Sequence, residues 1–237
     1  MNGMESFRCT FQIFVLIGIV SLAILVFPAN ADGGQVVLNP TDDTYVDEWN
    51  DESNYGAKSE LKIGDSSGDW ADYFYRAWLK FDLSSIPSEA TGITAILELH
   101  ESSWLGVSET HNVSVYVCPE NSWSEYALKW GNMPLYNRTL SLDCEFVHTS
   151  ETWYSWNVTK AIDNSTTLTV VLEESWLHDG AKYVQFDSKE AGNNIPRLTI
   201  RWTGVVPEFP SFLIISLFMI ATLLAAIIHR KKHIGIR

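Results

Sequence analysis

The 237-residue chain carries 16 Lys or Arg residues against 29 Asp or Glu residues, which gives a formal net charge of −13 at pH 7. Nucleic-acid binding requires a basic patch, so this acidic balance excludes nucleic acid as an expected partner. Hydrophobic residues make up 46% of the chain, which is enough for one sizeable core and two apolar terminal segments.

The N-terminus has the features of a secretory signal peptide. Arg8 supplies a positive charge, an apolar run follows over residues 11–27, and the sequence Ala-Asn-Ala ends at Ala31. This order of basic, apolar and small residues predicts cleavage after Ala31 and export of the chain. An uncleaved N-terminal anchor is the alternative. The signal peptide is therefore assigned to residues 1–31.

Residues 32–203 are expected to form one domain of roughly 170 residues. This segment holds 11 Lys or Arg residues and 27 Asp or Glu residues, so its net charge is −16. Such acidity keeps an exposed surface solvated.

Acidic residues crowd the beginning of this domain, between Asp42 and Glu52. Calcium binds to several hard oxygen ligands, and Asp43 and Asp47 are the candidate ligands here. The spacing lacks the 12-residue register and central glycine of an EF-hand loop. A structural calcium ion and a solvated acidic loop are the two alternatives for this segment.

Alternation of apolar and polar residues predicts strands. In residues 76–83, Ala77, Leu79 and Phe81 share one face, whereas Trp78 and Lys80 share the other. Half-buried strands have this period of two. Clusters of Gly, Pro, Asn and Asp separate the alternating segments, and this predicts an all-β fold, an antiparallel β-sandwich. Residues 158–164 are expected to form a helical turn. The alternation recurs in residues 93–99, 113–117, 168–172 and 198–202.

Aromatic residues are the candidates for a ligand site. All ten tryptophans lie between residues 49 and 202, more than one core of this size needs. Exposed aromatic rings stack on the CH face of a sugar while polar side chains pair with its hydroxyls. Ordinary core packing is the alternative for each ring. The candidates in polar or glycine-rich segments are Trp49, Tyr55, Trp70, Tyr73, Trp104 and Trp176.

The segment NSWSEYALKWGNMP, residues 121–134, contains two further tryptophans, Trp123 and Trp130. An odd offset of seven residues places them on opposite faces of a straight strand, so they cannot form one flat platform there. A turn between them would alter this geometry, so stacking on a ligand and packing into the fold are the two alternatives for this pair.

Two cysteines remain after removal of the signal peptide, Cys118 and Cys144. A pair of cysteines in an exported domain predicts a disulfide, which would stabilise the fold by roughly 3 kcal/mol. Two free thiols are the alternative. Asn-x-Ser/Thr sequences also predict glycosylation of an exported chain, at Asn112, Asn137, Asn157 and Asn164.

The C-terminal part has the features of a membrane anchor. Residues 204–210 form a short linker, and an uncharged apolar run then extends to residue 228. A run of about 20 apolar residues spans roughly 30 Å as a helix, which matches a bilayer core. The transmembrane helix is predicted over residues 211–228. The basic tail of residues 229–237 predicts a cytoplasmic C-terminus and a domain on the extracellular face.

No catalytic motif is recognisable in the sequence. It contains no H-E-x-x-H or G-x-S-x-G pattern and no glycine-rich phosphate loop. Glu173 and Glu174 are adjacent, so in a strand their carboxylates face opposite ways and cannot act on one bond. The chain is therefore predicted not to be an enzyme.

A series of short stretches runs in order along most of the domain: residues 43–46 (DTYV), 54–56 (NYG), 61–64 (LKIG), 76–87 (RAWLKFDLSSIP), 122–134, 156–159 (WNVT), 186–190 (FDSKE) and 196–198 (PRL). This series resembles the DNRLRE-type domain, carbohydrate-binding module family 96, of secreted bacterial and archaeal proteins. The resemblance implies a jelly-roll-like β-sandwich with affinity for polysaccharide. It also places Trp123 and Trp130 in the scaffold.

The linker resembles a second kind of signal. Pro207, Glu208, Phe209 and Pro210, followed by an apolar span and a basic cluster, are similar to the PEF-CTERM sorting signals of archaeal surface proteins. That resemblance implies cleavage near this motif by an archaeosortase-like enzyme and transfer to a membrane lipid. A retained membrane helix is the alternative, and both tether the protein to the outer face of the membrane.

Three functions are compatible with these features. The first is a non-catalytic, surface-tethered module that binds polysaccharide of the cell envelope or extracellular matrix, in adhesion or aggregation. The second is a structural envelope protein without a free ligand site. The third, an enzyme that degrades polysaccharide, would require two facing carboxylates about 5 to 9 Å apart in a cleft.

Overall fold

The computed structural model describes residues 33–65, 73–103, 110–163, 165–174, 183–205, 218–227 and 230. The chain divides into two units, residues 32–205 and the two terminal segments. Residues 218–227 are helical. Among the described residues, no helix combines the length and apolarity that crossing a bilayer requires. The predicted signal peptide, the sorting motif and part of the predicted membrane helix lie outside the described residues.

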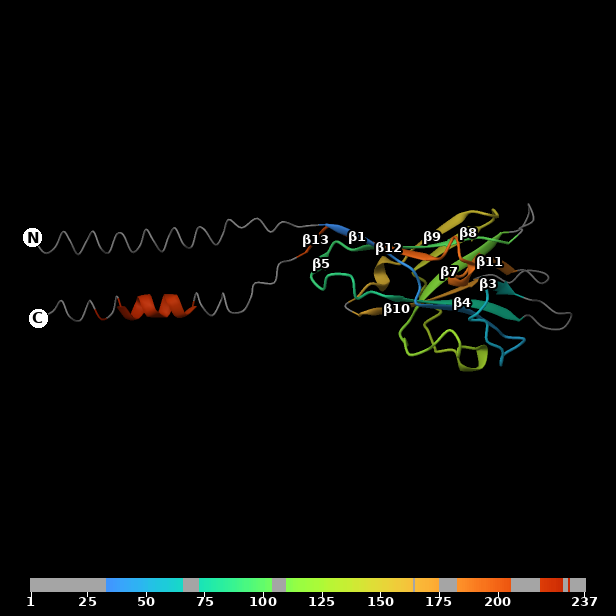
Figure 1. Ribbon diagram of the computed structural model, residues 1–237, viewed down its shortest axis with the longest axis horizontal. Helices are drawn as coiled ribbons and strands as arrows, with labels where there is room; N and C mark the ends of the chain where they lie inside the picture. The colour runs from blue at the N-terminus through green and yellow to red at the C-terminus, as the bar shows by residue number, and fades with distance from the viewer. Residues whose placement is uncertain are drawn as a thin grey trace, which may run out of the picture. The chain divides into compact units, whose positions relative to one another are not determined.

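The first unit is an antiparallel β-sandwich, which confirms the predicted fold class (Figure 1). The smaller sheet has the strand order β1–β12–β6–β9, and the larger sheet has the order β11–β3–β4–β10–β7–β8, with β2 also paired with β4. The smaller sheet consists of β1 (Gly34–Leu38), β12 (Arg197–Trp202), β6 (Thr94–His100) and β9 (Trp153–Asn157). The larger sheet consists of β11 (Tyr183–Asp187), β3 (Glu60–Asp65), β4 (Phe74–Asp82), β10 (Thr167–Glu174), β7 (His111–Cys118), β8 (Asp143–Val147) and β2 (Asp42–Asp47).

Short elements complete this unit. Strands β13 (Gly204–Val205) and β5 (Ala90–Thr91) form a separate two-stranded sheet. The 3-10 turns are η1 (Trp130–Asn132), η2 (Thr159–Ala161) and η3 (Lys189–Ala191). Turn η2 lies within residues 158–164, where a helical turn was expected.

The main core lies between the two sheets and is built from the predicted alternating rows. Ala77, Leu79 and Phe81 of β4 are fully buried in it, together with Leu97 of β6 and Leu198 of β12. Because every second side chain of a strand faces the same way, the period-two pattern correctly predicted which residues enter this core.

A second, smaller core lies on the other face of β4, beneath the segment of residues 119–142. Trp78 is fully buried there, although the alternation placed it on the polar face of its strand. Its ring contacts Trp123 edge-on, with 6.1 Å between the centroids. The Trp123 indole N–H also donates to Thr169 Oγ1 at 3.1 Å. Trp123 therefore packs into the fold, as expected, and half-buried Trp130 lies against the Arg76 guanidinium.

Candidate functional site

The turn after β2 is organised by one buried carboxylate. Asp47 Oδ1 accepts hydrogen bonds from the backbone N–H groups of Trp49 at 2.9 Å and Asn50 at 3.3 Å. Asp47 Oδ2 accepts from the Asn50 amide at 2.7 Å and from the Tyr55 hydroxyl at 3.0 Å. Asp side chains stabilise turns by bonding to backbone groups two or three residues ahead. This carboxylate therefore fixes the conformation from which Trp49 projects.

Trp49 is the most exposed tryptophan that the structure describes, with 63% of its surface accessible. Its ring meets Tyr73 edge-on at a centroid distance of 4.5 Å. The neighbouring Glu48 holds the turn to β4, since its backbone and carboxylate both hydrogen-bond to Phe74. The Trp49–Tyr73 pair is thus an exposed aromatic surface on a well-supported turn.

Four tyrosines in mutual ring contact form what we call the tyrosine row, which is joined to this turn by the hydrogen bond from Tyr55 to Asp47: Tyr45, Tyr55, Tyr75 and Tyr183. Tyr45 stacks on Tyr55 at 4.3 Å and meets Tyr75 at 5.9 Å, and Tyr75 meets Tyr183 at 5.3 Å, all between ring centroids. The Lys62 ammonium lies 4.9 to 5.7 Å from three of these rings, a cation–π arrangement. The row therefore combines ring faces, hydroxyls and one positive charge.

The environment raises the pKa of two hydroxyls of the row, those of Tyr45 and Tyr55. Burial raises the pKa of Tyr45, and the nearby Glu60 raises it further. Burial and the hydrogen bond to Asp47 likewise raise the pKa of Tyr55. Tyr45 is 3% exposed and the Tyr55 hydroxyl donates to Asp47, so these two residues support the row from within.

A separate cluster of three carboxylates joins Asp43 of β2, Glu125 and Glu190 of η3. One oxygen of each lies within 4.8 Å of the others. The Lys189 ammonium donates to Glu125 Oε1 at 2.9 Å and to Glu190 Oε1 at 2.6 Å. Burial raises the pKa of Asp43 to about 8; the hydrogen bond from the Lys189 N–H opposes this shift, and the nearby Glu190 adds to it. Among the residues that the structure describes, these three carboxylates form a group that could hold a metal ion.

The structure does not bring Asp47 into this cluster. Asp43 and Asp47 lie four residues apart on β2, which is roughly 13 Å along a strand. Asp47 is engaged in the turn beneath Trp49, so only one of the two predicted calcium ligands belongs to the carboxylate cluster.

The comparison with family models decides the family. The model of carbohydrate-binding module family 96 matches residues 34–202, nearly the whole sandwich. The chain belongs to this family. Its resemblance in short motifs is thereby confirmed for the domain, and the family 96 module coincides with the antiparallel sandwich described above.

Other comparisons add little to this assignment. No curated protein matches the family 96 module. One solved structure is described as showing the promiscuous specificity of carbohydrate-binding modules of the β-sandwich superfamily. It shares 13% identity with the chain at a TM-score of 0.22, and the match covers 76% of this chain and 62% of that one. The chain therefore spans less than two thirds of that structure, and a likeness this weak carries no argument about function.

Several predicted sugar contacts lie outside the described residues: Trp70, Trp104 and Trp176. In the described residues, Tyr75 of β4 and Tyr183 of β11 both pair with Gly64 of β3. Of the described candidates, the structure brings Trp49 and Tyr73 together and makes Tyr55 a support of their turn.

Sequence reasoning missed Tyr45 and Tyr183 of the row and the Lys62 ammonium beside it, and it missed Glu125 and Glu190 of the carboxylate cluster. Strand pairing brings Lys62 opposite Gln185, two residues from Tyr183. The cluster residues are separated by 65 to 147 positions along the chain, so no local spacing could have revealed them.

The predicted disulfide is wrong. Cys118 and Cys144 are both free. In the pairing of β7 with β8, Cys144 lies opposite Ser114, and Cys118 is four residues further along β7. That offset amounts to roughly 13 Å, whereas a disulfide requires Cα atoms less than about 7 Å apart.

The predicted glycosylation sites differ in accessibility. Asn112 is only 7% exposed and lies within β7, where its side chain contacts Cys144. Asn137 and Asn157 are exposed. Asn164 lies outside the described residues. A glycan on the sandwich is therefore sterically compatible with Asn137 and Asn157, but not with the packed position of Asn112.

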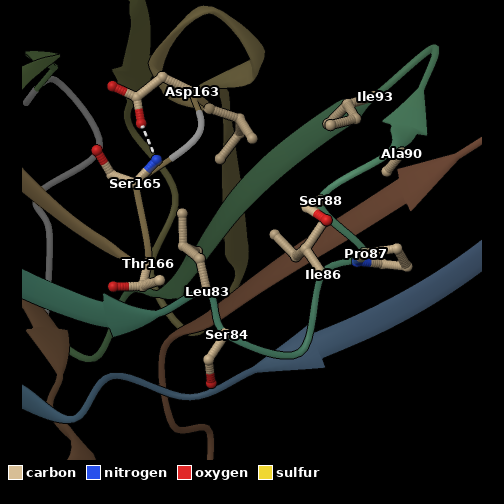
Figure 2. Close-up of a pocket in the computed structure, with 11 residues that line it drawn as sticks. Leu83, Ser84, Ile86, Pro87, Ser88, Ala90, Ile93, Asp163, Ser165 and Thr166 are labelled. Atoms are coloured by element: carbon tan, nitrogen blue, oxygen red, sulfur yellow. Dashed lines mark hydrogen bonds between the residues drawn. The ribbon is translucent and has the colours of Figure 1, made fainter. Parts of the chain in front are cut away.

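Two cavities lie away from the aromatic pair. One of about 380 Å³ is enclosed by the loops after β4 and β5, with Leu83, Ile86 and Ile93 among its lining residues (Figure 2). Its lining includes no aromatic ring, so it offers no stacking platform for a sugar. The other, about 460 Å³, lies beside Trp123 and Asn132.

Proposed function

We propose that this family 96 module binds polysaccharide at the Trp49–Tyr73 pair, with the half-buried Tyr75 and Tyr183 of the tyrosine row as the adjoining surface. The observation that carries the proposal is the exposure of Trp49 on a turn held by Asp47. A rigid aromatic platform loses little conformational entropy on binding, which favours affinity for a ligand with a flat apolar face. The half-buried Tyr75 and Tyr183 and the Lys62 ammonium supply polar partners for the same chain of sugars.

The carboxylates of the described residues support binding rather than catalysis. Glycoside hydrolysis requires two carboxyl groups that reach the same glycosidic bond. Within the carboxylate cluster, Asp43 is 1% exposed and Glu125 is 4% exposed. Groups buried to this degree cannot contact a polymeric substrate, so this cluster does not supply a catalytic pair, and the family supports a non-catalytic module.

Export and tethering remain part of the proposal on sequence grounds. A signal peptide of residues 1–31 and an anchor of residues 211–228 would place the module on the extracellular face of the membrane. The basic tail of residues 229–237 would then lie in the cytoplasm, unless an archaeosortase-like enzyme cleaves near residues 207–210. The polysaccharide would be that of the cell envelope or matrix, in adhesion or aggregation.

Mass spectrometry of the mature protein tests the processing. A new N-terminus at Asp32 is expected if the signal peptide is cleaved. Loss of residues after the motif of residues 207–210, with a lipid in their place, would support the sorting reaction. A mature C-terminus at Arg237 would support the retained helix.

Binding of the full-length chain to a panel of neutral and acidic polysaccharides tests the site. Trp49→Ala and Tyr73→Ala are expected to weaken binding at least about tenfold, which corresponds to about 1.4 kcal/mol. Phe146→Ala is the control, because Phe146 is a half-exposed aromatic residue on β8, away from the pair.

The outcomes separate the alternatives. Equal weakening by Phe146→Ala would show that general loss of aromatic surface, rather than this site, is responsible. Binding that is unaffected by Trp49→Ala and Tyr73→Ala would move the site elsewhere on the module. Absence of binding to every polymer by a folded chain would favour the structural envelope protein.

A further inference from the structure

Three carboxylates from distant parts of the chain converge beside β2. Asp43 lies on β2, Glu125 lies in the segment that covers the second core, and Glu190 lies in η3. Backbone groups hold two of them in place. The Asp43 N–H donates to Glu125 Oε2 at 3.1 Å, and the Lys189 N–H donates to Asp43 Oδ2 at 2.8 Å. The carboxylates are therefore pre-positioned by the fold rather than gathered by chance on a mobile surface.

One oxygen of this cluster is left without a partner. Asp43 Oδ1 is buried and accepts no hydrogen bond, although its residue is only 1% exposed. A buried carboxylate oxygen without a hydrogen-bond donor loses its hydration and forms no replacing hydrogen bond, so its burial lowers the stability of the fold. Because Asp43 belongs to the cluster, a cation there would supply the missing partner.

The charges of the cluster are also unbalanced. Three carboxylates face one ammonium, that of Lys189, which hydrogen-bonds to Glu125 and Glu190 but not to Asp43. The ionised cluster would carry a net charge of about −2, and buried charge is tolerated only when it is compensated. A single divalent cation cancels this charge without displacing the lysine.

We propose that Asp43, Glu125 and Glu190 bind a calcium ion. Carboxylate oxygens are hard ligands of the kind that Ca²⁺ prefers, and its flexible coordination accepts water in the remaining positions. The Glu190 and Lys189 side chains are each 22% exposed, so the cluster opens to solvent on their side. An ion can enter there while Asp43 and Glu125 form the buried floor.

Calcium at this position would join three loops of the sandwich. The Asn54 amide donates to the backbone carbonyls of Glu125 and Leu128, and the Ser188 hydroxyl donates to the carbonyl of Lys58 at 2.6 Å. The ion therefore would add a central link to contacts that already connect these segments. Its expected effect is on stability, and it does not depend on the proposed sugar site.

Thermal unfolding of the full-length chain, stripped with a chelator, tests the proposal. Adding CaCl₂ at constant ionic strength and pH is expected to raise the Tm by about 5 to 10 °C at roughly 100 times the Kd. Isothermal titration calorimetry with CaCl₂ is expected to show one ion per chain. Glu190→Gln and Glu125→Gln are expected to weaken calcium binding at least about tenfold.

Glu52→Gln is the matched control, since Glu52 is an exposed carboxylate that pairs with Lys129 outside the cluster. It should bind calcium like the original chain. Glu190→Gln is the decisive variant if Glu125→Gln does not fold, because the Glu190 side chain is partly exposed. An unchanged Tm and no calcium binding by the original chain would overturn the proposal and leave a proton and Lys189 to neutralise the cluster. Calcium binding that survives Glu190→Gln would place the ion elsewhere and overturn it equally.

Discussion

The two faces of the larger sheet bury their side chains by different means. The inner face meets the smaller sheet through apolar residues such as Leu79, Val170 and Phe186. The outer face buries Trp78 beside an ion pair in which Arg76 Nε lies 2.8 Å from Glu173 Oε2. Tyr136 also donates to Glu173, at 2.7 Å. The inner face is thus stabilised mainly by apolar burial, whereas the outer face also depends on charged groups whose partners must all be present.

The two kinds of burial are expected to lose stability differently when a residue is substituted. Apolar contacts are non-directional and lose stability in proportion to the volume removed. A buried ion pair adds little over an apolar replacement, yet removal of one partner leaves an uncompensated charge. The inner core should therefore respond to size, and the outer layer to pairing.

The largest loss of stability is expected in the inner core. Trp156 is fully buried, contacts Phe186 edge-on and donates its indole N–H to the Val113 carbonyl at 2.9 Å. Trp156→Ala should lower the free energy of unfolding by about 3 to 5 kcal/mol, measured by urea denaturation. Trp49→Ala, at an exposed site, should change it by less than about 0.5 kcal/mol. Similar losses for both variants would contradict the placement of Trp156.

A somewhat smaller loss is expected for the outer ion pair. Arg76→Met removes one of two guanidinium groups from buried Glu173 and should cost about 2 kcal/mol, since Arg138 still pairs with that carboxylate and Tyr136 still donates to it. Arg197→Met breaks the partly exposed pair with Glu98 and should cost less than about 1 kcal/mol. Chemical denaturation of both variants measures the contrast, and equal costs would show that burial does not distinguish the two pairs.

A pH dependence is expected where a carboxylate borders the inner core. Glu101 is buried, and burial raises its pKa above the ordinary 4.5 despite hydrogen bonds from Ser103 and Glu151. The folded state then holds the proton more tightly than the unfolded state. Its contribution to stability is complete below pH 4.5 and is lost as the pH rises through the folded pKa.

Glu101→Gln removes this titration. The variant should lose less stability than the original chain between about pH 4 and 7, as measured from urea midpoints across that range. All other ionisable groups are shared by the two proteins, so only the difference between their pH profiles is informative. Parallel profiles would mean that burial does not perturb Glu101.

The smallest effect is expected from reduction. Because Cys118 and Cys144 are free, a reducing agent should leave the Tm unchanged, within about 1 °C. Alkylation of the unfolded chain without prior reduction should modify both thiols, as detected by peptide mass spectrometry. A protected pair of cysteines would instead restore the disulfide and require a different register between β7 and β8.

The inner core could be predicted from the sequence because its signal is local. Ala77, Leu79 and Phe81 repeat every second residue, and the pleat of a strand converts that repeat directly into one buried face. Trp78 broke the rule. The outer face of β4, on which Trp78 lies, is covered by the segment of residues 119–142. The alternation of apolar and polar residues along one strand does not show whether a second layer covers that strand.

The family of the domain and its β-sandwich architecture were thus determined by the sequence itself, through ordered motifs and period-two strands. Only the tertiary structure decided which distant residues meet. Strand register separated Cys118 from Cys144, and loop packing joined Asp43 to Glu125 and Glu190 instead of to Asp47. The physical reason is that burial follows from each strand's own pattern, whereas a site depends on strand order and register, which the packing of the whole domain sets.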